Sequence, residues 1–154
     1  MTSATVPAAS PLDRFVGATL RGALIVFGLA TCLPILLTIN LDLGNRALFR
    51  GGLQPDPSVD LIVRHWGFMI FGVGVLMIAS SFLPWLRFAA LTFAAAEKIL
   101  LVAMVVINLG QPWGRDYLTA ALLDGTIVIY CILYFLSSHG RPGRWVPAAN
   151  GQDR

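Results

Sequence analysis

Two charged residues, Glu97 and Lys98, lie inside the apolar run AAAEKILLVAMVV at residues 94–106. An ionised side chain at the centre of a transmembrane helix costs about 3 kcal/mol, so such a residue is expected to have a partner or a function. Adjacent positions on a helix point about 100° apart, which makes these two side chains a poor ion pair. Each of them therefore needs a partner from another segment.

Asp124, in the next apolar run, is the expected partner of Lys98. By helical rise, Asp124 lies about 10 Å inside its run from Tyr117, and Lys98 lies about 16 Å inside its own run from Leu109. A lysine side chain can close a difference of this size. The sequence therefore predicts an ion pair between the third and fourth apolar runs.

Further polar residues are expected near this pair. Glu97 and Asn108 are eleven residues apart, close to three helical turns, and so share one helix face. His65 lies at the outer end of the second apolar run, in the same half of the membrane. We expect one polar pocket with apolar walls, open toward the non-cytoplasmic side and formed by Glu97, Lys98, Asp124, His65 and Asn108.

Such a pocket suits a small lipophilic ligand such as a quinone. Lys98 or His65 would donate a hydrogen bond to a carbonyl oxygen, while Glu97 or Asp124 would exchange protons with the ligand. No other cofactor is expected, and no residue can be assigned as catalytic. A metal site is not expected either, because His65 and His139 lie at opposite membrane faces, about 30 Å apart.

Three other interpretations of the charged residues stay open. The pair of Lys98 and Asp124 can be purely structural and fix the helix register, with Glu97 uncharged. The chain can instead be a membrane-embedded isomerase or cyclase that uses its buried carboxyls as acid and base. It can also be a small proton-coupled transporter, although its two halves show no inverted repeat.

The composition indicates a membrane protein. Of 154 residues, 56% are hydrophobic and 12% are charged, whereas soluble domains are about one-quarter charged. Apolar runs predict an all-α, polytopic membrane protein with four transmembrane helices, spanning residues 22–39, 63–83, 88–109 and 117–137. The links after the second and third spans are short, so neighbouring helices are antiparallel and form an up-down bundle. The longer connection at residues 41–63 is expected to contain an interfacial helix.

The ends of the chain flank this transmembrane domain, which we place at residues 13–138. Residues 1–12 are rich in Ala, Ser, Thr and Pro and are expected to form a disordered tail. Residues 139–154 are expected to form a cytoplasmic tail. Six arginines lie on the side of the termini and four on the other side, so the positive-inside rule places both termini in the cytoplasm. The net charge of +3 does not indicate a nucleic-acid partner, because the arginines collect beside span ends.

Small residues predict where helices pack closely. Gly67, Gly74 and Ser81 follow one another at intervals of seven and nearly share a face of the second span. Pro34 has no backbone N–H and is expected to kink the first span.

The layout of four short spans with both termini inside, the RHWG at the start of span two and the Glu97-Lys98 pair in span three resemble the DoxX-like group of small bacterial integral membrane proteins. The resemblance covers nearly the whole chain. It implies an accessory or anchor subunit of the bacterial inner membrane, associated with quinone or thiol redox systems. The expected partners are the lipid bilayer and either another membrane protein or further copies of the chain.

Overall fold

The computed structural model describes residues 10–53, 56–137 and 139, and these residues form helices with no strand among them. The elements are α1 (Pro11–Cys32), α2 (Ile35–Ile39), α3 (Leu41–Phe49), α4 (Pro57–Phe82), η1 (Pro84–Leu86), α5 (Arg87–Ile107), η2 (Pro112–Tyr117) and α6 (Leu118–Leu136). Four stretches are long and apolar enough to cross a membrane, namely Pro11–Ile39, Pro57–Phe82, Pro84–Ile107 and Trp113–Leu136. The predicted all-α fold with four transmembrane helices is confirmed.

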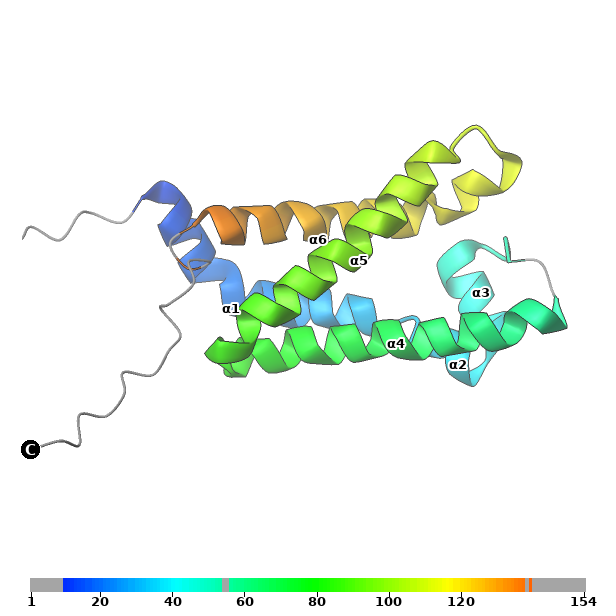
Figure 1. The fold of residues 1–154 in the computed structure, drawn as a ribbon, viewed down its shortest axis with the longest axis horizontal. Coiled ribbons are helices and arrows are strands. Elements are labelled where there is room, and N and C mark those ends of the chain that lie inside the picture. The colour runs from blue at the N-terminus through cyan, green and yellow to red at the C-terminus, as the bar shows by residue number, and fades with distance from the viewer. Residues whose placement is uncertain (1–9, 54–55, 138, 140–154) are drawn as a thin grey trace, which may run out of the picture.

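The long helices run alternately in opposite directions, so the start of α1 and the end of α6 lie at the same end of the bundle (Figure 1). Helix α1 packs against α4, α5 packs against α6, and α4 contacts α5. The short helix η1 makes the tight turn between α4 and α5. This arrangement is the predicted up-down bundle.

Helix α1 begins at Pro11, well before the predicted start of the first span at residue 22. A capping box explains this start: the Ser10 hydroxyl accepts a hydrogen bond from the Asp13 N–H, and the Asp13 carboxylate accepts one from the Ser10 N–H. The helix thus begins at Pro11, within the last residues of the predicted tail at residues 1–12. The rest of that tail, at residues 1–9, lies outside the described residues, as does the predicted cytoplasmic tail apart from His139.

The first span breaks at Pro34, as predicted. Helix α1 ends at Cys32, the Leu33 N–H donates to the Ala30 carbonyl in a tighter turn, and α2 starts at Ile35. The carbonyl of Ala30 thus keeps a partner although Pro34 cannot donate to it.

The chain then reverses into α3, the helix expected in the connection. The Asn40 side chain accepts from the Leu43 N–H and caps α3. Gly44 allows α3 to lie directly on α2, because a Cβ at this position would lie 2.6 Å from the Leu37 nitrogen. Helix α3 therefore folds inward, and its last residue, Phe49, is buried.

Helices α1 and α4 approach each other through glycine. A Cβ on Gly74 would lie 2.6 Å from the Gly28 carbonyl oxygen and 2.6 Å from the Cys32 Sγ. Gly67, Gly74 and Ser81 are all buried, so the predicted packing face of this helix is confirmed.

The hydrophobic core is concentrated at the end of the bundle where α1 begins and α6 ends. It contains Val16, Leu20 and Leu24 of α1, Val73 and Met77 of α4, Leu91 and Ala94 of α5, and Ile127, Tyr130, Cys131 and Tyr134 of α6. Toward the other end, α5 diverges from α4 (Figure 1), and α3 packs against α2 and contacts α6. The bundle is thus packed tightly in one half and more openly in the other.

Candidate functional site

Lys98 of α5 is 2% exposed, which is unusual for a lysine. Its ammonium Nζ lies 2.7 Å from Oδ1 of Asp124 on α6 and donates a hydrogen bond to it. Asp124 is also buried. The structure therefore contains the ion pair between the third and fourth spans that the depths of the two residues predict.

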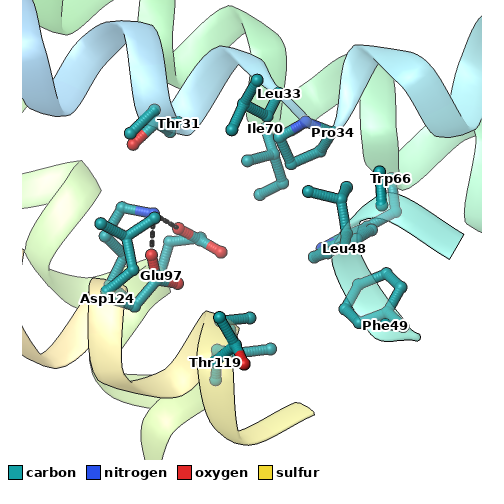
Figure 2. Close-up of a pocket in the computed structure, with 16 residues that line it drawn as sticks. Thr31, Leu33, Pro34, Leu48, Phe49, Trp66, Ile70, Glu97, Thr119 and Asp124 are labelled. Atoms are coloured by element: carbon teal, nitrogen blue, oxygen red, sulfur yellow. Dashed lines mark hydrogen bonds and ion pairs between the residues drawn. The ribbon is translucent and has the colours of Figure 1, made fainter. Parts of the chain in front are cut away.

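Glu97 also contacts the Lys98 ammonium. Its Oε2 lies 3.5 Å from the Lys98 Nζ, which is longer than a strong charge-assisted hydrogen bond. Apart from this ion pair, Oε2 has no hydrogen-bond partner among the described residues. The Lys98 ammonium thus contacts two carboxyl groups, those of Glu97 and Asp124, and dashed lines in Figure 2 mark these two contacts.

This charged group forms one end of a cavity of about 340 Å³. The cavity is lined by residues of α1, α3, α4, α5 and α6 together with the turn at Pro34. Most of its wall is apolar and includes Leu33, Pro34, Leu48, Phe49, Trp66 and Ile70, which surround the open space in Figure 2. The volume is within the range of small-molecule sites, about 300–1,000 Å³.

Thr31 adds a fourth polar group to this end of the cavity. Its side chain is 2% exposed, and its hydroxyl has no hydrogen-bond partner among the described residues. Figure 2 shows Thr31 on α1, across the cavity from Glu97 and Asp124. Sequence reasoning missed this residue; the only signal was a hydroxyl side chain in an apolar run, one turn before Pro34.

Helix α3 closes the outer end of the cavity with an aromatic cluster. The Phe49 ring lies 4.8 Å from the Tyr117 ring and 6.3 Å from the Trp66 ring, measured between centroids. The Asn45 side chain fixes the end of α3, because it donates to the Leu53 carbonyl and accepts from the Leu53 N–H. The polar groups are therefore shielded on the side toward the connecting loops.

The structure does not bring His65 and Asn108 to this cavity. The His65 side chain is exposed, whereas its neighbour Trp66 lines the cavity, since adjacent helix positions point about 100° apart. The Asn108 side chain donates to the Met104 carbonyl at 2.7 Å and caps the end of its own helix. The expectation that these two residues share one pocket with Glu97, Lys98 and Asp124 is corrected accordingly.

The chemical capacity of the site follows from its donors and acceptors. The Lys98 ammonium has three protons, of which one is donated to Asp124. Glu97 offers a carboxyl oxygen, and Thr31 offers a hydroxyl that can donate or accept. A ligand that carries oxygen atoms on an apolar ring can accept hydrogen bonds from Lys98 and Thr31, and from Glu97 when its carboxyl group is protonated. In the described part of the chain, no three His, Cys, Asp or Glu side chains are grouped as a metal site.

The fold and this buried cluster define a small integral membrane protein with charged groups inside its helix bundle. The chain matches no protein-family model, no curated protein and no solved structure.

Proposed function

We propose that this protein binds a small lipophilic ligand with ring oxygens, such as a quinone, in the cavity beside Lys98. One observation carries the proposal. A buried ammonium contacts two carboxyl groups at one end of a mostly apolar cavity inside a membrane-spanning bundle, near a hydroxyl that has no partner among the described residues. Ionisable groups within a membrane mark functional sites by default.

A purely structural role explains only part of this arrangement. An ion pair between Lys98 and Asp124 is enough to fix the register of α5 and α6. It does not require Glu97 or Thr31, nor an open volume beside them, since protein interiors are normally packed without voids. A ligand explains the open volume and all four polar groups together.

The site favours a neutral, oxygen-bearing head group. Two carboxyl groups and one ammonium disfavour an anion at this position. Lys98 would donate a hydrogen bond to a carbonyl oxygen of the ligand, and Glu97 would accept a proton from it or return one. Trp66 and Phe49 provide apolar ring surface along the wall for the ligand ring.

In this role the chain is an accessory or anchor subunit of the bacterial inner membrane, with both termini in the cytoplasm. It works beside a membrane protein that carries the redox cofactor or beside further copies of itself. The resemblance to the DoxX-like group belongs to the same proposal. The cavity then lies in the outer half of the membrane, away from the termini.

Quenching of Trp66 fluorescence tests the proposal. Replacing Trp85, Trp113 and Trp145 with Phe leaves Trp66, which lines the cavity, as the reporter. A benzoquinone without a long chain, titrated into the purified protein in mild detergent, should quench Trp66 saturably because the bound ring lies beside the indole.

Two variants and one control make this test specific. Glu97→Leu and Thr31→Val should each weaken binding about tenfold, because each removes a group that can donate a hydrogen bond to a quinone carbonyl, worth roughly 1.4 kcal/mol. His65→Gln should leave binding unchanged, because this side chain does not line the cavity. Quenching that never saturates, or that is equal in all variants, would show that the cavity does not bind the quinone ring.

A further inference from the structure

A second cavity of about 270 Å³ lies between α4 and α5. It is next to the cavity that contains Lys98, Asp124 and Thr31, called the polar cavity. The lining of this second cavity is more apolar than that of the polar cavity, because Glu97 is the only charged side chain among its described lining residues. The two cavities share Trp66, Ile70, Glu97 and Leu101. A wall of four side chains therefore separates them, and Glu97 belongs to both.

The second cavity is a groove that faces the lipid. Met69 of α4 is 51% exposed, and Phe93, Leu100 and Met104 of α5 are 54%, 63% and 56% exposed. Met69, Phe93 and Leu100 lie in the inner part of their spans, at the depth of the hydrocarbon chains, and Met104 lies nearer the end of its span. The partial exposure of the Glu97 side chain, 19%, is consistent with its place beside this groove.

Direct contacts close several other parts of the polar cavity. Backbone contact between Gly28 and Gly74 seals α1 against α4, and the ion pair of Lys98 with Asp124 ties α5 to α6. Phe49 and its neighbouring rings cover the outer end. Helix α5 starts beside the end of α4 at η1 and diverges from it (Figure 1), and the groove between these two helices offers a path from the lipid to Glu97.

We propose that the ligand is a single-chain amphiphile that reaches the site from the lipid, with its ring in the polar cavity and its apolar chain in the groove between α4 and α5. This inference rests on the proposed function and adds to it the class of ligand and its path. The ligand's apolar chain would pass through the wall between the two cavities at Glu97 and Leu101. Met69 and Met104 supply flexible, unbranched side chains that can adjust to an alkyl or isoprenoid chain.

The ligand's apolar chain determines where the ligand lies more than how tightly it binds. Lipid tails are as apolar as the groove, so moving a chain from the bilayer into the groove gains little hydrophobic free energy. The test of this inference is therefore which residues the ligand's apolar chain contacts.

Photolabelling locates it directly. The probe is a benzoquinone with a decyl chain that carries a diazirine, photolysed with the full-length protein in phosphatidylcholine vesicles and mapped by mass spectrometry. The label should be found on Met69, Leu100 and Met104, and excess chain-free benzoquinone should suppress it. Labelling spread evenly over lipid-facing residues such as Leu122 and Ile129 of α6 would overturn the inference.

A pair of substitutions separates this inference from the function on which it rests. Leu100→Trp fills the groove and should reduce labelling about fivefold, because the indole ring occupies the space that the alkyl chain would take. Ile99→Trp is the matched control, because Ile99 is 51% exposed but lines neither cavity. Equilibrium dialysis should show that both variants still bind chain-free benzoquinone like the unmodified protein.

The outcomes are distinguishable. If the unmodified protein does not bind chain-free benzoquinone, the proposed function fails and this inference fails with it. If that quinone binds but the probe labels Leu100→Trp as strongly as Ile99→Trp, only the proposed path of the ligand's apolar chain is wrong.

Discussion

Lys98 neutralises Asp124 and also approaches Glu97, so the charge balance of the buried cluster depends on it. Lys98→Met should lower the free energy of unfolding by about 3 kcal/mol, because it leaves a buried carboxylate without its partner. The double variant Lys98→Met/Asp124→Leu should recover most of this loss, since both charges are then gone. Titration with sodium dodecyl sulfate, followed by circular dichroism, measures both values.

The single variant Asp124→Leu completes the double-mutant cycle for this pair. If the losses of the two single variants simply add in the double variant, Lys98 and Asp124 are not coupled. The observed contact of 2.7 Å would then have no energetic consequence.

Thr31 has a hydroxyl that is buried without a partner among the described residues. Thr31→Val should therefore stabilise the protein by about 1 kcal/mol, because Val keeps the shape and removes an unsatisfied donor. The same substitution should weaken quinone binding, so stability and affinity change in opposite directions. Unfolding in sodium dodecyl sulfate and quenching of Trp66 report the two effects.

Thr126→Val is the matched control for this substitution. Thr126 is exposed on α6, and its hydroxyl donates to the Leu122 carbonyl of its own helix. Neither stability nor binding should change by more than about 0.5 kcal/mol there. A loss of stability in Thr31→Val would mean that the Thr31 hydroxyl does have a partner in the folded protein.

The site could be predicted from the sequence only where charge revealed it. Lys98 and Asp124 were found because a charge within a span needs a partner, and helical rise places both at reachable depths. Thr31 carries no charge, so an apolar run can contain it without any visible cost. His65 and Asn108 were misplaced because depth does not determine direction around the helix.

The packing of α1 on α4 depends on glycine at one crossing point. Gly74→Ala should lower the free energy of unfolding by about 2 kcal/mol, because its methyl group would press on the Gly28 backbone, which cannot move aside easily. Gly72→Ala, on the same helix, should be neutral or slightly stabilising, since a Cβ there meets nothing within 4 Å. Equal effects in unfolding titrations with sodium dodecyl sulfate would contradict the close contact.

The helices themselves were mostly predictable, because four apolar runs of sufficient length admit few other structures in a bilayer. Hydropathy missed the first turns of α1, since Asp13, Arg14 and Arg21 interrupt the apolar pattern while a capping box extends the helix. It also missed that α3 folds inward. That packing depends on the contact of Gly44 with Leu37, which no periodicity in either segment indicates.

The open half of the bundle is a property of the whole molecule. The cavity exists because α1 and α4 meet at glycines, α5 leaves α4 at an angle, and α3 covers the space between them. Each of these contacts joins residues far apart in the sequence. Composition and spacing predict four spans, but the volume enclosed by them depends on crossing angles that only the assembled structure provides.

The alternating helices place η1 and η2 at opposite ends of the bundle, and the arginine distribution predicts which end is cytoplasmic. In a variant with Cys32 and Cys131 replaced by alanine, Trp85→Cys and Trp113→Cys introduce thiols at exposed positions of these two ends. A membrane-impermeant maleimide added to intact cells should label Trp113→Cys, and should label Trp85→Cys only after the membrane is permeabilised. The reversed pattern would contradict the orientation alone, whereas equal labelling of both from outside would contradict the four-span arrangement.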